Sequence, residues 1–417
     1  MNDLSMNFLA SGTDLNDFYS QLEDISKSTD AMLVKSDKLA MSAITISDDD
    51  ALELALMTSS GDAEFFKKSF NETLNNEKVP LIHFDPVKNA YGLFKLKFDS
   101  LRGKLDKETI SELLYDSKML MNIDGTSYVV APCAFLTLLS RAGLGGDAMC
   151  HPSIGRVMEI FKQLVYRKPQ TITLITRKNE IGGKSIIAAH SGKYAYIPQT
   201  AIREIIDAFS KKFGVIDCLE WAVTQENSYC YISFPDVAKD IAALYNMPDE
   251  AIPGVCVSTS DCGESSFKVR SLWKIKGHIF GGETYKCRHR GSVSLDDFIT
   301  EVSKQIYAEY KTVPQKLNDL LKIDVPNPVA ALKKVFQDIS MTKAIGKKKS
   351  MELLNAISME FSPTLKYTAY DIVMSVSTVS ERLIGASRAV IERVEGAAKR
   401  AIFVDFNDNS QKIILGA

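Results

Sequence analysis

Two spacings of hydrophobic residues alternate along this chain, and they predict different elements. Near the N-terminus the spacing is that of one helix face, which predicts a short amphipathic helix. Its apolar positions are Leu15, Phe18, Leu22 and Ile25. Further on, segment 171–177 is rich in β-branched residues, and a similar segment at 185–190 follows a glycine-containing turn. These two segments are predicted to form a β-hairpin.

The same mixture of strands and helices continues through the middle of the chain. Asp124-Gly125 is a turn signal before a strand that ends at Val130. Other strands are expected at 91–98, 213–221 and 228–234, and helices at 107–121, 131–142, 152–165, from about 200, and at 236–245. Because hairpins dominate over βαβ units, the predicted fold class is α+β, with a central antiparallel-rich sheet domain.

Helical spacing dominates from Ser294 onward. The expected helical segments are 295–310, 329–339, 347–359 and 368–404, with breaks at Pro314, Pro326, Pro328 and Pro363. The predicted organisation is an acidic, partly mobile N-terminal arm at 1–60, an α+β core domain at 61–293, a helical C-terminal region at 294–404 and a tail at 405–417.

The predicted arm is the most acidic part of the chain. Residues 1–60 hold eleven acidic residues against three lysines, a net charge of −8. Two interpretations are open. The segment is either a solvated, loosely packed terminus, or an arm that competes for the protein's own basic surface.

Composition places the chain among folded proteins and predicts no association with a membrane. Its 417 residues are 45% hydrophobic and 24% charged, which suits two or three domains with a full core. There is no run of about 18 uncharged apolar residues, and the N-terminus lacks the features of a signal peptide. The seven cysteines lie mostly in apolar or strand-like segments, which favours reduced thiols in a cytoplasm.

Positive charge is concentrated in two hairpin segments. Residues 266–290 carry seven Lys or Arg and one acid, Glu283, a net of +6. Residues 161–193 again carry seven cations against Glu180, also a net of +6, whereas the whole chain has a net charge of −2. Aromatic residues lie between the cations in both segments. This combination is typical of a surface that binds a polyanion, and nucleic acid is the usual one.

Guanidinium and ammonium groups neutralise phosphates, and aromatic faces stack on unpaired bases. The predicted phosphate contacts are Arg177, Lys178, Lys184, Lys193, Lys268, Arg270, Lys274, Lys276, Arg288 and Arg290. The predicted stacking residues are Tyr194, Tyr196, Trp273 and Tyr285. Lys343 and the run Lys347-Lys348-Lys349 form a third basic cluster that can add a phosphate contact. The alternative is that both hairpins are solvated faces whose aromatic residues point inward.

Other chemistries find little support in the sequence. Segment 181–185 resembles the end of a phosphate-binding loop, but Lys178 occupies the position of the required first glycine. Cys256, Cys262, Cys287 and His289 lack the usual spacing of zinc ligands, and Cys256 alternates with valines as a packed strand residue does. There is no nucleophilic motif and no paired-carboxylate arrangement. We therefore expect no catalytic residue, metal or cofactor, and an enzyme is not the favoured class.

Three short elements resemble the phage/plasmid-like protein family, a domain family of unassigned function in bacteriophages and mobile elements. The first is Met121–Leu144, which includes Leu138-Leu-Ser-Arg-Ala-Gly-Leu144. The second is Ser191-Gly-Lys-Tyr-Ala-Tyr-Ile-Pro198, and the third is Val257–Val269 with Arg288-His-Arg-Gly291 downstream. Two departures occur: His289 follows Arg288 directly, and 272–278 stands where the family has a Cys-x-Asn-Gly-like element. The resemblance covers about residues 115–310 and implies a phage or plasmid origin, hence a host cytoplasm, and no defined activity.

The leading hypothesis is a phage-type protein that binds single-stranded nucleic acid, with DNA preferred, and assists recombination or replication. The arrangement of basic hairpins and attached helices is also similar to that of phage single-strand annealing proteins, for which a homo-oligomer is expected. The second hypothesis is a protein-interaction module, such as an inhibitor of a host defence factor or a virion-assembly component with a host or phage partner. A third is an enzyme that acts on nucleic acid, which requires a carboxylate or histidine cluster.

Overall fold

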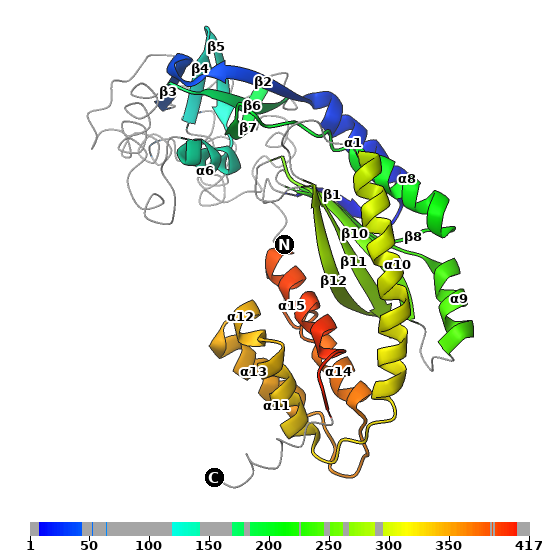
Figure 1. Ribbon diagram of the computed structural model, residues 1–417. Helices are drawn as coiled ribbons and strands as arrows, with labels where there is room; N and C mark the ends of the chain where they lie inside the picture. Colours follow the sequence, from blue (N-terminus) through cyan, green and yellow to red (C-terminus); the bar gives the residue numbers. More distant parts are fainter. Residues whose placement is uncertain are drawn as a thin grey trace.

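The computed structural model describes residues 8–43, 52, 64, 119–141, 169–178, 184–224, 227–245, 251–261, 267–287, 295–383, 386 and 388–406. Within these ranges the chain forms two six-stranded sheets and a set of helices concentrated toward the C-terminus (Figure 1). The predicted α+β class is confirmed. The expected strand at 91–98 and the expected helix at 152–165 lie outside the described residues, as does the expected helix at 107–121 up to residue 118.

Sheet A is antiparallel throughout and has the order β1-β8-β9-β10-β11-β12. Its strands are β1 (Phe8–Gly12), β8 (Asp217–Thr224), β9 (Ser228–Ser233), β10 (Ala251–Thr259), β11 (Phe267–Ile275) and β12 (His278–Cys287). Strands β11 and β12 form the predicted basic hairpin. Its turn places Lys276 at φ 52° and Gly277 at φ 87°, which is the left-handed pair that a two-residue hairpin requires.

One face of sheet A supplies the main hydrophobic core. Helices α1 (Leu15–Ser28), α8 (Ala201–Phe213) and α10 (Leu295–Leu320) contribute to this core, together with alternate residues of β11. The predicted N-terminal helix is confirmed as α1, which buries Phe18, Leu22 and Ile25. Helix α9 (Pro235–Tyr245) contacts β10 and α10.

Sheet B has the order β2-β6-β7-β5-β4-β3, and only β5 and β7 pair in parallel. Its strands are β2 (Thr29–Lys35), β3 (Leu39–Ala43), β4 (Met119–Ile123), β5 (Thr126–Val130), β6 (Thr171–Lys178) and β7 (Lys184–Ser191). The predicted hairpin at 171–190 is confirmed as β6 and β7. The predicted turn at Asp124-Gly125 joins β4 to β5, with φ values of 48° and 84°.

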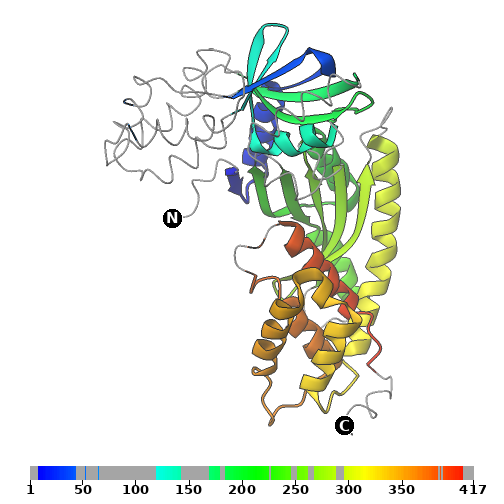
Figure 2. The ribbon, with the colours of Figure 1, turned by 90° about the vertical axis from the view of Figure 1, so that its left-hand side faces the viewer.

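The two edges of sheet B meet, so the sheet curls into a small barrel. Its edge strands β2 and β3 are separated in the chain by three residues, Ser36–Lys38, which span at most about 10 Å. The buried side chains inside it come from all six strands and from α6 (Pro132–Arg141). Helix α6 lies beside the strands (Figure 2) and inserts Ala134 and Leu138 into this core. The Thr137 hydroxyl accepts the backbone N–H of Ala189 at 2.8 Å, which ties the helix to β7.

The N-terminal segment belongs to both sheets. Residues 8–43 supply β1 to sheet A and β2 and β3 to sheet B, so over this range the predicted arm is integral structure. Its acidic residues pair with distant cations on the surface: Glu23 with Arg203 at 2.9 Å and Asp30 with Lys184 at 2.8 Å. Residues 44–60, Leu52 excepted, lie outside the described part of the chain.

The predicted helical C-terminal region is present. It comprises α10 and then α11 (Pro328–Asp338), α12 (Met341–Ile345), α13 (Lys347–Ser358), α14 (Ala369–Ser377) and α15 (Arg388–Ala401). The predicted break at Pro314 is wrong. Helix α10 continues through Pro314, whose ring is buried between the core residues Val313 and Leu317. Segment 368–404 divides into α14 and α15. Within the described ranges, no helix combines the length and apolar character needed to cross a membrane.

Candidate nucleic-acid interface

Helix α15 neutralises much of the charge that the β11–β12 hairpin carries. Arg270 is only 3% exposed, and its guanidinium donates to the Glu395 carboxylate and, at 2.8 Å, to the Tyr231 hydroxyl. Burial alone disfavours the charged form, but the Glu395 charge outweighs it and raises the pKa of Arg270. Lys268 pairs with Glu392 of the same helix at 2.8 Å. These two cations hold α15 on the sheet and are not presented to a phosphate backbone.

The predicted stacking residues of this hairpin pack inward. Trp273 is fully buried, and its ring meets that of Tyr310 edge to face, with centroids 5.6 Å apart. Trp273 is therefore not accessible for stacking on a base. Tyr285 is half-buried against the same core, and burial, followed by the charge of Glu309, raises its pKa.

Two of the remaining cations, Lys274 and Lys276, lie toward the turn of the hairpin, whereas Lys286 lies opposite Lys268 near its other end. Lys274 is half-exposed, and Lys276 is exposed with its ammonium 5.2 Å from the centre of the Tyr370 ring. Arg288 and Arg290 lie outside the described residues. Cys256 packs in β10 as predicted, and burial raises the pKa of its thiol.

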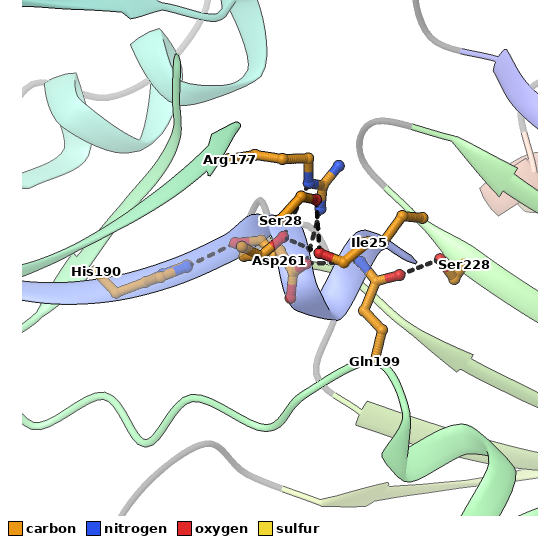
Figure 3. Close-up of polar contacts among 8 residues, drawn as sticks. Ile25, Ser28, Arg177, His190, Gln199, Ser228 and Asp261 are labelled. Carbon is orange, nitrogen blue, oxygen red and sulfur yellow. Dashed lines mark hydrogen bonds and ion pairs between the residues drawn. The ribbon is translucent and has the colours of Figure 1, made fainter. Parts of the chain in front are cut away.

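Three predicted residues of the second basic segment, Arg177, Tyr194 and Tyr196, lie at or beside the place where the two sheets meet, and Figure 3 shows Arg177 there. Arg177 is 9% exposed; it pairs with Asp261 at 3.0 Å and donates to the Thr29 hydroxyl at 3.1 Å. Tyr194 stacks on His190, with ring centroids 3.9 Å apart. Tyr194 and Tyr196 both pack on apolar side chains of β6 and β7. These three residues are engaged in contacts within the protein, and they leave little free surface on which a base could stack.

Asp261 is the centre of that junction. It is fully buried, and its carboxylate also accepts from the Gln199 amide at 2.6 Å, while its backbone carbonyl accepts from His190 Nε2 at 2.8 Å. Gln199 in turn accepts from the Ser228 hydroxyl at 2.6 Å. Since Arg177 and His190 belong to sheet B, and Asp261 and Ser228 follow or begin strands of sheet A, the network connects both sheets. Asp261 therefore has a structural role where the two sheets meet.

Three predicted cations remain on the outside of the barrel. Lys178 is exposed at the end of β6, Lys184 is half-exposed at the start of β7, and Lys193 is exposed just after β7. Lys178 and Lys184 stand opposite one another in the strand register, so they flank the connection at 179–183. The hydrogen bond to Asp30 raises the pKa of Lys184 and lowers that of Asp30.

The topology of the barrel defines its class. If β2 and β3 are counted as one bent strand, the barrel has five strands, and the first pairs with both the second (β4) and the fourth (β6). The third (β5) and the fifth (β7) pair in parallel, and α6 stands between the third and the fourth. This is the arrangement of the OB-fold, a partly open Greek-key barrel. In OB-folds, oligonucleotides bind across strands two and three and the connections between strands one and two and strands four and five.

No family model, curated protein or solved structure matches the chain. The resemblance to the phage/plasmid-like family stays a prediction. Sequence reasoning identified Lys178 and Lys184 but missed the barrel around them. The parallel pairing of β5 with β7 joins segments more than 50 residues apart, with residues such as Val129 opposite Ser185, and local periodicity contains no sign of it.

Proposed function

We propose that this protein binds single-stranded nucleic acid on the barrel of sheet B. The observation that carries the proposal is the OB-fold topology of that barrel, with Lys178 and Lys184 on either side of the connection between its fourth and fifth strands. OB-folds that bind single strands use a positively charged groove along the backbone. DNA is the preferred ligand, and assistance in recombination or replication is the role that the sequence favours.

The ion pair between Lys184 and Asp30 allows the lysine to exchange its partner. Both side chains are substantially exposed, 39% and 56%, so the pair contributes at most about 1 kcal/mol. A phosphate group can therefore compete with the Asp30 carboxylate for the ammonium. Asp30 belongs to the acidic N-terminal segment, which fits the interpretation that this segment competes for the basic surface.

The test is fluorescence anisotropy with an end-labelled oligothymidylate at several salt concentrations. The double variant Lys178→Gln/Lys184→Gln should bind at least tenfold more weakly, and its salt slope should fall by about 1.4 because two single-strand phosphates lose their partners. Lys304→Gln/Lys316→Gln, two exposed lysines of α10, is the matched control and should bind as the wild type does. Asp30→Asn should tighten binding.

Two results would overturn the proposal. One is an affinity of the wild-type protein for single strands that does not change with salt. The other is an equal loss of affinity in the barrel pair and in the α10 control pair, since the barrel would then have no special part in binding.

A second candidate function, a contact with a protein partner or with a second copy of the chain, rests on exposed apolar side chains. Met351, Met359 and Leu365 in the helical region are 53%, 85% and 63% exposed. Exposed methionine side chains are flexible and are common at surfaces that bind other proteins. Sedimentation velocity over a concentration series tests self-association, and Met359→Lys should shift the protein toward monomer. A wild type that stays monomeric at the highest concentration excludes the second copy.

A further inference from the structure

A cleft of about 940 Å³ lies at the β12 edge of sheet A, away from the barrel. Its walls come from β12, α10, α12 and α15, and α15 lies between β12 and α12 (Figure 1). The volume is within the range of about 300–1,000 Å³ that is usual for small-molecule sites, and it exceeds what a single inorganic ion needs. No residue of this cleft belongs to sheet B, so it is independent of the proposed interface on the barrel.

Ion pairs neutralise the floor of the cleft. Arg270 pairs there with Glu395, and Lys399 pairs with Glu309 at 2.6 Å. Both cations are almost fully buried, at 3% and 9% exposed. These pairs fix the positions of α10 and α15 against the sheet edge. They add little net charge of their own.

The rim of the cleft carries a surplus of positive charge. Lys286, Lys343, Arg393 and Arg400 line the cleft and are exposed, and none of them forms an ion pair with a described residue. Arg400 is anchored by one hydrogen bond, 2.8 Å to the backbone carbonyl of Ile339. On the acidic side, Glu392 is already paired with Lys268 and Glu309 with Lys399, which leaves Glu283. Four cations against one carboxylate favour an anionic ligand.

Two glycines of β12 allow the buried polar side chains of the floor to approach the backbone closely. The register of β11 and β12 shifts at this point, so Gly282 and Glu283 bulge opposite Ser271. A Cβ on Gly282 would lie 1.9 Å from the Ser271 hydroxyl and 2.6 Å from Lys399 Nζ, and one on Gly281 would lie 1.9 Å from the Arg270 guanidinium. Bulges with glycine recur beside binding sites, because they allow a close approach to the backbone.

An aromatic ring completes the cleft. Phe403 lines it just after the end of α15 and is 48% exposed, which is unusual for a residue of its kind. An exposed ring beside unpaired cations supplies the two contacts that a nucleotide uses, a stacking face for the base and charge for the phosphate. We propose that this cleft binds a nucleoside phosphate, either a free nucleotide or the phosphorylated terminal nucleotide of a strand.

The first test is isothermal titration of the full chain with each of the four 5′-deoxynucleoside monophosphates, with the nucleosides and with inorganic phosphate. At least one monophosphate should bind, and at least tenfold more tightly than its nucleoside or inorganic phosphate. Lys286→Gln/Arg393→Gln should weaken this binding at least tenfold, whereas Lys304→Gln/Lys316→Gln should not change it. Phe403→Ala should weaken nucleotide binding about tenfold and leave phosphate binding unaffected. Because all five residues are exposed, thermal unfolding should show the variants folded as the wild type is.

The second test separates a free nucleotide from a strand end. A short oligothymidylate with a 5′-phosphate is compared with the same oligonucleotide without it, in the Lys178→Gln/Lys184→Gln background, where the barrel is impaired. Tighter binding of the phosphorylated form assigns the cleft to strand ends, and equal binding together with monophosphate binding assigns it to free nucleotides. Failure of all four monophosphates and of the phosphorylated oligonucleotide to bind, or binding that the rim variant leaves unchanged, overturns the inference. Neither outcome affects the proposal for the barrel.

Discussion

The buried ion pair between Arg270 and Glu395 allows a quantitative test of how α15 is held on sheet A. Glu395 is 4% exposed and Arg270 3%, and the guanidinium also donates to the Tyr231 hydroxyl and to the Glu392 carbonyl. Glu395→Ala leaves this guanidinium buried without a counter-charge, which costs about 3–5 kcal/mol. The higher helix propensity of alanine returns only a few tenths of a kcal/mol, so destabilisation dominates.

The assay is urea unfolding followed by tryptophan fluorescence. The chain has two tryptophans, Trp221 and Trp273, and both are buried in the core of sheet A, so the signal reports on this part of the protein. With a slope of about 3 kcal/mol per molar urea, the midpoint should fall by roughly 1–2 M. Glu360→Ala is the control, because it breaks the exposed pair of Glu360 with Arg382 and should cost less than about 1 kcal/mol.

The double variant Arg270→Met/Glu395→Leu distinguishes a loss of stability caused by the unpaired charge from one caused by lost packing at Glu395. An apolar replacement of both partners removes the stranded charge, so this variant should recover most of the stability that Glu395→Ala loses. A loss in Glu395→Ala no larger than in Glu360→Ala would refute the reasoning. So would a double variant as unstable as the single one, because the loss would then arise from packing.

Two further predictions concern the barrel and its junction with sheet A, and a third concerns the start of α9. Asp261→Asn removes the counter-charge of Arg177 and should destabilise the protein by about 1.5–3 kcal/mol in urea unfolding, whereas Asp30→Asn should be nearly neutral. Thr137→Val leaves the Ala189 N–H without its acceptor and should cost about 1–3 kcal/mol, with faster hydrogen exchange at that amide as the specific readout. The hydrogen bond from the Val215 N–H, aided by Lys239, lowers the pKa of Asp236. Its stabilising effect is therefore present above the unfolded pKa of about 3.9 and is lost as the pH falls through the lower folded value, which NMR titration can measure.

Local periodicity predicted elements well where one face of the element meets a core. Helix α1 buries three of the four residues that its spacing marked and packs the fourth, Leu15, partly against the same core. Strands β6 and β7 occupy the β-branched segments. It failed where tertiary packing overrides a local rule, as at Pro314. The buried face of α10 extends on both sides of that residue, and this packing outweighs the one hydrogen bond that the proline cannot donate. The barrel was not predictable in the same way, because its closure depends on a three-residue corner and a parallel pair between distant segments.

The predicted site shows why charge along a sequence differs from charge on a surface. The segments 161–193 and 266–290 stood out by composition, yet Arg177, Lys268 and Arg270 are matched by carboxylates far away in the chain. The net charge of a sequence segment does not include these carboxylates, because they lie far from it in the chain. Trp273 points inward for a similar reason. It shares with Phe267, Val269 and Ile275 the face of β11 that packs against the core.

The unpaired cations on the rim of the cleft also result from ion pairs between residues that are distant in the chain. Lys286 comes from a basic segment, whereas Lys343, Arg393 and Arg400 come from the helical region, where Arg393 stands between Glu392 and Glu395 in the sequence and Lys343 belongs to the third basic cluster. The four cations come together because two ion pairs fix α15 beside the β12 edge. These are the pairs of Arg270 with Glu395 and of Lys399 with Glu309, which lie at the floor of the cleft. The acids of α15 are thus used in holding the helix, and its arginines are left on the rim. Helix α15 has four cations and two acids, and because both acids are paired it presents a positive surface to one side of the cleft. This surface is the physical basis for expecting an anionic ligand there.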